Sequence, residues 1–323
     1  MIQKVNENKQ RDELMLYRLS SFFYREGKLE IQRLFVINPH VIQIATKQGE
    51  NFILKGQRKK SVVEQQWDFL EKMDASIVVP LTNYPNGRRI IEYKNNFWTI
   101  APYIKGEKLN YSNKNDRKTA VLALNDFHDK ATGIYVSRPV KRDLFIIRWY
   151  QRLHSFKKTE HLFVKYGFKH LYRVIVQTME AQLLELKQFP WHYLEKEALQ
   201  KGSWVHGDVA SHNFIRNEQV YMIDFDLLDR KTQVYDYIQL GQRFLPYINW
   251  DMNELLSYQM TGERDIKPWL TAILVPSDLL REWLYYLKGD SPTPVYEYLR
   301  QMEISMTNRV SFLKKAKSVL KSI

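Results

Sequence analysis

Two aspartates and an asparagine stand close together in one short part of the chain. Residues 205–215 read VHGDVASHNFI and place Asp208 and Asn213 on a short loop between apolar runs. A second apolar run, VYMI, leads directly into Asp224. Carboxylate and amide oxygens are hard ligands of the kind that Mg²⁺ takes together with phosphate oxygens and water. The spacing therefore predicts a loop and a following strand end that hold a magnesium nucleotide.

The same residues suggest how a phosphoryl group could be transferred. In such reactions the protein mainly positions the reactants, and metal ions neutralise charge on the phosphate oxygens. Asn213 and Asp224 suit the metal, which leaves Asp208 to accept a hydrogen bond from an attacking hydroxyl and to take its proton late. The alternative is a β-hairpin in which Asp208 and Asn213 make turn hydrogen bonds. That alternative does not explain Asp224, so kinase chemistry is favoured.

The segment resembles the aminoglycoside phosphotransferase and choline kinase-like family, distant relatives of protein kinases. The catalytic loop of that family reads H-G-D-x-x-x-x-N and its metal-binding strand reads I-D-x, and both patterns are complete here. The resemblance implies that Asp208 is the catalytic base and that Asn213 and Asp224 are the magnesium ligands. It also implies that His206 braces the loop from behind.

The fold that the resemblance implies is α+β and bilobal, as in protein kinases. A small, antiparallel β-rich N-terminal lobe that binds the nucleotide is expected over residues 1–104, including a hinge strand. A larger, mostly helical lobe with the catalytic loop and the acceptor-binding helices is expected over residues 105–323. Residues 34–37, 41–45 and 51–55 read as the first strands of the small lobe, separated by tight turns.

Lys55 ends the third of these strands, where the phosphate-binding lysine of the family falls. An ordinary lysine at a strand end is the alternative. A helix is predicted over residues 61–73, with Ser61 as its N-cap and Glu64 at the capping-box position. Glu64 and Glu71 lie two turns apart on one face, so either could reach Lys55. Glu64 is favoured, although a capping-box role explains it equally well.

Residues 97–107 resemble the strand and hinge that link the two lobes. In this family the adenine bonds to hinge backbone groups, which here lie around Ala101 to Tyr103. Pro102 has no N–H, so the donor is expected to be Tyr103 or Ile104.

The sequence departs from the family pattern in two places. No glycine-rich loop precedes Lys55, and the first predicted turn, residues 38–40, contains no glycine. After Asp224, Asp236 matches a later aspartate that braces the catalytic loop in this family. Asp226 has two possible roles, as a third carboxylate near the metal or as a simple turn residue.

Composition narrows the class of protein. The chain has 323 residues, is 44% hydrophobic and contains no cysteine, which excludes disulfides, zinc thiolates and thiol catalysis. The formal net charge of +13 fits nucleic acid, an acidic partner or a solvated basic surface. No zinc-finger or RNA-binding signature accompanies the charge, so nucleic acid is not expected. The absence of cysteine fits a cytoplasmic setting. Residues 1–12 lack a signal-peptide core, and no apolar stretch is long enough for a membrane span, so a soluble protein is expected.

From residue 111 onward the chain reads as mostly helical. Residues 144–199 look like inserted helices, which in this family wall the acceptor pocket and decide the substrate. The last helix, residues 294–323, carries an apolar stripe and several lysines. Packing of the stripe on the second lobe is favoured over binding to an anionic membrane or an acidic partner.

Two functions from different classes follow. The first is an ATP-dependent phosphotransferase, with GTP as the alternative nucleotide and Mg²⁺ as the metal, that transfers the γ-phosphate to a hydroxyl of a small-molecule acceptor. The second is a catalytically weak or inactive kinase-shaped binding protein, similar in style to spore-coat-associated members of the family. Joint retention of Lys55, Asp208, Asn213 and Asp224 favours the enzyme.

Overall fold

The computed structural model describes residues 16–289 and 291–322. Three expectations concern residues outside the described ranges. They are the expected absence of a signal peptide at residues 1–12, the first part of the predicted small lobe and the last residue of the predicted final helix. The chain divides into two compact units. The sheet unit comprises Met1–Glu107, Ile134–Val140 and Ile215–Asp226, and the helical unit comprises Lys108–Gly133, Lys141–Phe214 and Leu227–Ile323.

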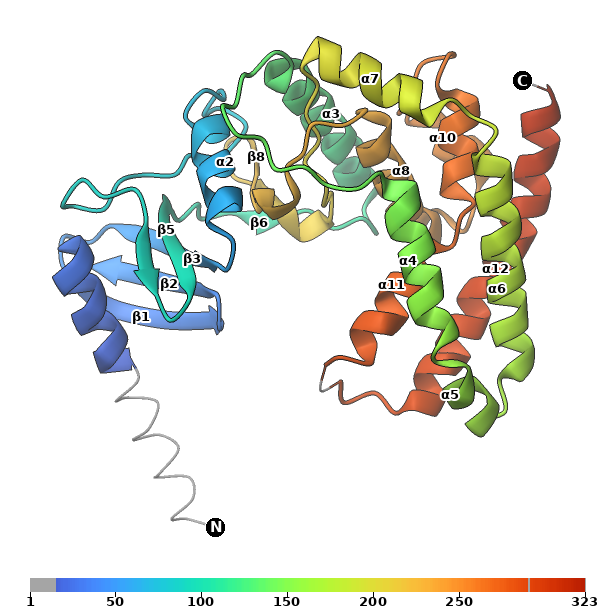
Figure 1. The fold of residues 1–323 in the computed structure, drawn as a ribbon, viewed down its shortest axis with the longest axis horizontal. Helices are drawn as coiled ribbons and strands as arrows, with labels where there is room; N and C mark the ends of the chain where they lie inside the picture. Colours follow the sequence, from blue (N-terminus) through green and yellow to red (C-terminus); the bar gives the residue numbers. More distant parts are fainter. Residues whose placement is uncertain (1–15, 290, 323) are drawn as a thin grey trace. The chain divides into compact units, whose positions relative to one another are not determined.

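The sheet unit is built on a five-stranded antiparallel sheet, in the order β1-β2-β3-β5-β4 (Figure 1). Its strands are β1 (Ile31–Asn38), β2 (Val41–Thr46), β3 (Asn51–Gln57), β4 (Ile91–Tyr93) and β5 (Asn96–Pro102). Buried and partly exposed residues alternate along β2, as expected for a strand with one face in the core. Two residues join β1 to β2, and the Asn38 side chain accepts a hydrogen bond from the His40 N–H at 2.8 Å. The predicted strands and this turn are confirmed.

One face of the sheet carries the core of the unit. Ile44 and Leu54 are fully buried there and pack with Leu19 and Phe23 from the helical residues 16–27. Because side chains alternate along a strand, Lys55 points to the face opposite Leu54. The sheet thus separates an apolar face from a face that carries Lys55.

Helix α2 (Lys60–Leu70) follows β3 in the sheet unit. Its N-cap is Lys59, and no side chain caps the helix. The predicted capping box of Ser61 and Glu64 is therefore wrong, because Ser61 already lies inside the first turn. The buried side chains of α2 begin at Val62 and end at Leu70, and Glu64 lies on its exposed face.

The helical unit contains the remaining α-helices. They are α3 (Lys114–Ala131), α4 (Phe145–Lys157), α5 (Glu160–Lys165), α6 (Lys169–Leu186), α7 (Trp191–Lys201), α8 (Val234–Phe244), α9 (Met252–Ser257), α10 (Ile266–Ile273), α11 (Ser277–Tyr286) and α12 (Val295–Ser322). The short strands β6 (Glu107–Lys108), β7 (Phe214–Arg216) and β8 (Val220–Met222) pair in that order, and β8 belongs to the sheet unit. An antiparallel N-terminal sheet followed by a mostly helical region confirms the predicted α+β class.

Helix α12 packs on the helical unit through an apolar stripe. It lies beside α6 and contacts α9 and α10 (Figure 1). Met302, Met306 and Phe312 are buried at helical spacing, and Lys317 reaches Glu185 on α6 at 2.7 Å. The packing interpretation of this helix is confirmed. Among the described residues, no helix has the length and apolar character that crossing a bilayer requires.

Candidate functional site

Within the sheet unit, Lys55 is held by two carboxylates. Its Nζ lies 2.6 Å from Oδ1 of Asp224 and 2.6 Å from Oδ1 of Asp226. Asp224 follows β8, which is anchored in the same unit because the Met222 N–H donates to the Ile77 carbonyl at 2.7 Å. The expected strand end at Lys55 is wrong by two residues, because β3 continues to Gln57. Lys55 of β3 and Asp224 of the I-D-F-D segment are therefore brought together across 169 positions of sequence.

The electrostatics of this group favour the ion pairs. Burial alone would lower the pKa of Lys55, but the charges of Asp226 and Asp224 outweigh it and raise that pKa. Gln66 on α2 donates to Oδ1 of Asp226 at 3.0 Å. Asp226, which the sequence left unassigned, is thus a partner of Lys55 that α2 holds in place.

Neither predicted glutamate pairs with Lys55. Glu64 lies 3.6 Å from Lys60, and Glu71 lies 2.7 Å from Arg89. The buried face of α2 presents Gln66 instead of a glutamate. The predicted Lys55–Glu64 pair is replaced in the structure by Lys55–Asp224 and Lys55–Asp226.

Asp224 has an unusual backbone conformation. Its φ of +68° lies in the left-handed region, which few non-glycine residues adopt. Such conformations cost about 1–3 kcal/mol and persist where the surrounding structure holds them. The Lys55 ion pair and the anchored β8 supply that support, so the carboxylate is fixed in direction as well as in position.

The predicted hinge is the end of β5. Ala101 pairs with Ile53 of β3 in the antiparallel register. The Tyr103 N–H already donates to the Asn51 carbonyl at 2.9 Å. Of the two donors predicted for the adenine, Tyr103 is therefore engaged in the sheet, and Ile104 remains.

In the helical unit, Asp236 organises the loop that carries Asp208. One oxygen of the fully buried Asp236 accepts from the His206 N–H at 2.8 Å, and the other accepts from the Gly207 N–H at 2.9 Å. His128 approaches the same carboxylate at 3.0 Å. The predicted bracing role of Asp236 is confirmed by these bonds. His206 is fully buried, and its Nδ1 accepts from the Asp208 N–H at 3.2 Å.

Gly207 is required by the shape of this loop. Its φ is +83°, and a Cβ added there would lie 2.5 Å from the Leu227 carbonyl oxygen. We expect Gly207→Ala to lower the free energy of unfolding by about 2–4 kcal/mol, because the strained backbone and the clash add. Urea unfolding measures this loss. Gly262→Ala is the matched control, since a Cβ there meets nothing within 4 Å, and an equal loss in both variants would contradict the assignment.

One face of α8 supplies the contacts that set the loop. Asp236, Gln239 and Arg243 are spaced i, i+3 and i+7, so they lie on the same side of the helix. Gln239 donates to the Gly207 carbonyl at 3.0 Å, and Arg243 Nη2 donates to Asp208 Oδ1 at 2.6 Å. Gln239 and Arg243 were not predicted from the sequence, where their only signal is that they share a face of α8 with Asp236.

A hydrogen bond within the loop fixes the side chain of Asn213. Its buried side chain donates through Nδ2 to the Asp208 carbonyl at 2.9 Å. That bond turns the amide so that Oδ1 is the remaining polar atom of the side chain, and an amide oxygen is a suitable Mg²⁺ ligand. The helical unit thus presents Asp208 and Asn213 together, and the sheet unit presents Asp224 with Lys55.

Two buried carboxylates lie behind the loop. Glu195 and Asp229 share Lys231, whose Nζ lies 3.8 and 4.0 Å from them, and the Asp229 backbone pairs with Val205. Burial raises the pKa of Glu195 to about 7 and that of Asp229 to about 6. The folded state therefore favours their protonated forms.

This raised pKa predicts a pH dependence of stability. A carboxyl whose pKa is higher in the folded state binds protons more tightly there, so its contribution is complete below the unfolded pKa and is lost as the pH rises through about 7. We expect Glu195→Gln to remove about 1–3 kcal/mol of the decline in unfolding free energy between about pH 5 and pH 8. Urea unfolding across that range measures it. The exposed Glu180→Gln control should follow the wild-type curve, and an unchanged slope in Glu195→Gln would refute the expectation.

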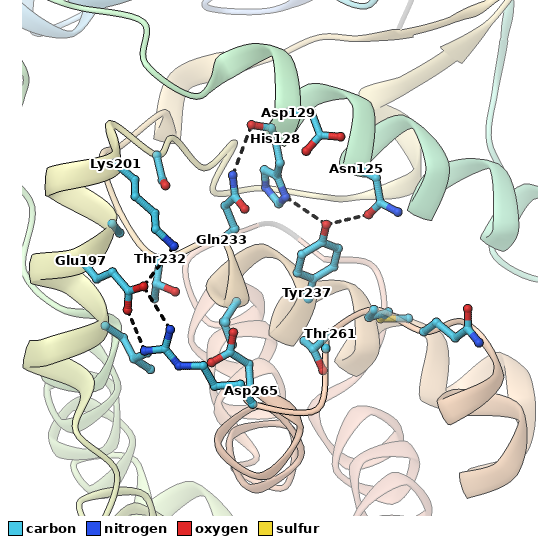
Figure 2. A pocket seen from close by; sticks show the side chains of 18 residues that line it. Asn125, His128, Asp129, Glu197, Lys201, Thr232, Gln233, Tyr237, Thr261 and Asp265 are labelled. Atoms are coloured by element: carbon cyan, nitrogen blue, oxygen red, sulfur yellow. Dashed lines mark hydrogen bonds and ion pairs between the residues drawn. The ribbon is translucent and has the colours of Figure 1, made fainter.

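The helical unit also contains a cavity of about 520 Å³ beside the end of α3. In Figure 2, Tyr237 lies between His128 and Asn125 and is hydrogen-bonded to both, at 3.1 and 2.6 Å. Glu197 on another wall of the cavity pairs with Lys201 and Arg264. Asp208 is not among the residues that line this cavity.

Comparisons with known proteins bear on the fold. No family model matches the chain, and no curated protein is similar in sequence. Among solved structures, an aminoglycoside phosphotransferase from Alicyclobacillus acidocaldarius is 14% identical, with a TM-score of 0.67, over 93% of this chain and 95% of that chain. An amicoumacin kinase in complex with AMP-PNP, Ca²⁺ and Ami is 16% identical, with a TM-score of 0.61, over 96% of both chains. A Plasmodium vivax ethanolamine kinase is 13% identical, with a TM-score of 0.53, over 87% of this chain and 82% of that chain.

These similarities extend over most of each chain at low identity. Together with the five-stranded sheet and the helical region that follows it, they confirm the predicted resemblance at the level of the fold. The chain therefore has the α+β, kinase-like fold of the aminoglycoside phosphotransferases and the choline and ethanolamine kinases.

Proposed function

We propose that this protein is a magnesium-dependent phosphotransferase that moves the γ-phosphoryl group of ATP to a hydroxyl of a small-molecule acceptor. GTP is the alternative nucleotide. The observation that carries the proposal is the Lys55–Asp224 ion pair, which joins two residues 169 positions apart. The amicoumacin kinase of the same fold holds AMP-PNP and Ca²⁺, which supports a nucleotide and a divalent cation here.

The side chains present suit such a metal. Asp224 and Asp226 already hold one cation, the Lys55 ammonium. The Asp224 side chain is 42% exposed, so it can also be reached from solvent. Asn213 and Asp224 would hold the magnesium, which supplies neutralisation of charge on the phosphate oxygens.

The remaining residues have distinct roles in the proposed reaction. Lys55 orients the α- and β-phosphates, and the backbone near Ala101 and Ile104 bonds the adenine. Asp208 aligns the acceptor hydroxyl. As the hydroxyl oxygen forms its bond to the γ-phosphorus, the bond to the β–γ bridging oxygen breaks and the hydroxyl proton passes to Asp208. We retain the division into a nucleotide-binding lobe at residues 1–104 and an acceptor lobe at residues 105–323 as part of the proposal.

The partners of Lys55 lead to a specific prediction. We expect Asp226→Asn to raise the KM for ATP about 5- to 30-fold, because a charge-assisted bond of about 1–2 kcal/mol to Lys55 is lost. Glu64→Gln is the matched control and should leave this KM unchanged, since Glu64 pairs with Lys60. Steady-state kinetics with varied ATP measure both. The reverse pattern would restore Glu64 as the partner of Lys55.

A kinase-shaped binding protein without catalysis, such as a spore-coat-associated protein, is the second candidate. The observation that favours it is the β1–β2 turn, where proline and histidine stand instead of glycines that could approach phosphates closely. A cytoplasmic location goes with the proposed enzyme, and a spore-associated location goes with the binding protein.

A thermal-shift experiment separates the two candidates. ATP and GTP are each added with and without Mg²⁺, and ADP formation is then measured with pooled alcohols, amino acids and sugars. Ligand at about 100 times its Kd stabilises the folded state by about 2.7 kcal/mol, which corresponds to a rise in Tm of several degrees. The enzyme requires a magnesium-dependent rise and acceptor-dependent ADP formation. Absence of any nucleotide-dependent shift would refute the phosphotransferase and favour the binding protein.

A further inference from the structure

The cavity of about 520 Å³ in the helical unit has no role in the proposed transfer. Its walls come from the end of α3, one side of α7, the start of α8 and the segment that precedes α10 (Figure 2). Pockets that take small organic molecules have volumes of about 300–1,000 Å³, so this cavity is large enough for such a ligand. Asp208 is not among its lining residues, which makes the cavity a candidate for a second binding site.

The charged side chains of the cavity favour a cationic ligand. Three carboxylates and two cationic side chains line it, which gives a formal charge of −1 with histidine counted as neutral. Both cations are held by the same carboxylate, because Lys201 lies 3.0 Å from Glu197 and Arg264 bonds to both Glu197 oxygens at 3.0 and 2.7 Å. Asp129 and Asp265 have no ion pair within 4.0 Å in the described part of the chain. These two carboxylates are therefore available to a cation in the cavity.

Asp265 has the stronger need of a partner. It is the N-cap residue of α10, but its side chain makes no capping hydrogen bond. Its Oδ1 is buried and has no hydrogen-bond partner among the described residues. Burial raises the pKa of Asp265, and the opposing charge of Arg264 does not offset this effect. Because a buried acceptor without a donor is costly, the Asp265 carboxylate gains from a ligand that donates a hydrogen bond.

The rest of the lining has two kinds of surface. Hydroxyl groups that can accept hydrogen bonds come from Ser203, Thr232 and Thr261. Apolar side chains that can pack against methylene groups come from Leu194, Ala198, Val234 and Met260. An ammonium group has three donors and no acceptor, so hydroxyl and carboxylate oxygens suit it. A short alkyl chain that carries an ammonium group therefore matches the carboxylates, the hydroxyls and the apolar surface together.

A chain of hydrogen bonds leads from the cavity wall to the catalytic loop. The hydroxyl of Tyr237 lies 3.1 Å from Nδ1 of His128, and Nε2 of His128 lies 3.0 Å from Oδ2 of Asp236. The same oxygen of Asp236 accepts from the His206 N–H at 2.8 Å. All four residues belong to the helical unit. A ligand that contacts Tyr237 is therefore connected to the catalytic loop by consecutive hydrogen bonds.

We propose that the cavity binds a small organic cation, a protonated alkylamine, whose ammonium group bonds to Asp265 and whose presence stabilises the catalytic loop. Burial and the charges of Asp236 and Asp129 raise the pKa of Tyr237, so negative charge also reaches this wall of the cavity. An anionic ligand would meet repulsion from the unpaired carboxylates. The site lies apart from the proposed transfer chemistry and does not depend on it.

Three probes that share a four-carbon chain and differ in their end groups test the ligand class. Putrescine, its diol analogue butanediol and the dianion succinate are each titrated calorimetrically into the full chain. Putrescine should bind at least about tenfold more tightly than butanediol, because a charge-assisted hydrogen bond replaces a neutral one. Equal affinity for the diamine and the diol, tighter binding of succinate, or no detectable binding of putrescine would overturn the proposal.

Variants then locate the amine on the protein. Asp265→Asn should weaken putrescine binding about tenfold or more, and asparagine is an equally good N-cap, so α10 is expected to keep its start. Asp129→Asn removes the other unpaired carboxylate and should weaken binding about two- to fivefold, because its exposed charge is screened. Glu263→Gln is the matched control, since Glu263 is exposed beside Arg264 and does not line the cavity. Unchanged affinity in both aspartate variants, or an equal loss in Glu263→Gln, would overturn the assignment.

Hydrogen exchange tests the connection to the catalytic loop. With putrescine at about ten times its Kd, the amides of residues 204–210 should exchange about tenfold more slowly, because opening of the loop releases the ligand. The amides of α6, which supplies no wall of the cavity, should be unaffected. Tyr237→Phe keeps the ring and removes the hydroxyl, so it should bind putrescine and lose the protection of the loop. Equal protection in Tyr237→Phe and in wild type would overturn the connection.

The same titrations keep this site and the phosphotransferase distinguishable. Putrescine binding in a wild-type chain that does not bind magnesium ATP would refute the phosphotransferase and support the cavity site. Magnesium ATP binding without putrescine binding would overturn the cavity site alone.

Discussion

Asp208→Asn is expected to lower kcat about 10³-fold or more while the Kd for ATP stays within about twofold of wild type. The reason is that asparagine cannot take the proton of the acceptor hydroxyl, and general-base groups contribute about 10²–10⁴ to rate. Its side-chain oxygen can still accept from Arg243, which bonds to Asp208 at 2.6 Å in the wild type. The loop held by Asp236 is therefore expected to keep its shape.

Two measurements check this result. Steady-state kinetics give kcat, and calorimetric titration of the nucleotide gives Kd. Asp126→Asn removes an exposed carboxylate that pairs with Lys130 on α3 and serves as the control, with unchanged values of both. Loss of nucleotide binding in Asp208→Asn would show that Asp208 supports the structure instead of the chemistry.

Asp224→Ala should abolish the part of nucleotide binding that depends on Mg²⁺, a loss of about 100-fold or more in the affinity for magnesium ATP. Removal of the carboxylate takes away a hard oxygen ligand, which Mg²⁺ needs in a near-octahedral shell. It also takes away one of the two partners of Lys55. ATP binding in the presence of a metal chelator should weaken less, by about 5- to 30-fold, because one bond to Lys55 is lost while Asp226 still holds the lysine.

The comparison requires titrations of ATP with and without Mg²⁺ for each variant. Glu92→Gln, at an exposed position on β4 of the same unit, is the control and should behave as wild type. If Asp224→Ala binds magnesium ATP like wild type, Asp224 is not a metal ligand and the assignment of the site is wrong.

The strands and the main helices could be predicted because their signals are local. Alternation in β2 and the two-residue turn before it specify a hairpin, and the apolar spacing in α2 and α12 specifies helices. The ends of elements were less predictable. Ser61 looks like an N-cap, yet the helix begins earlier, at Lys60, without any side-chain cap.

The functional motif was readable for a different reason. Asp208 and Asn213 lie on one loop, and Asp224 follows the strand that comes soon after it. Gly207 precedes Asp208, at a position where φ is +83° and glycine is favoured. These residues can therefore be found from two short segments of sequence. Their partners Lys55, Gln239 and Arg243 come from other elements, so the motif does not reveal the pairing.

By itself, the sequence predicted the first strands, several helices and the residue types that could bind magnesium and phosphate, and the resemblance to a known family implied the α+β class. These properties depend on neighbours along the chain, through periodicity, turn chemistry and motif spacing. Only the tertiary structure decided that Lys55 pairs with Asp224 and Asp226 instead of Glu64, that the Tyr103 N–H is engaged by Asn51, and that Arg243 of α8 binds Asp208. Ion pairs form between whichever charged groups packing brings within a few ångströms, and burial sets their strength, so neither can be read from positions along the chain.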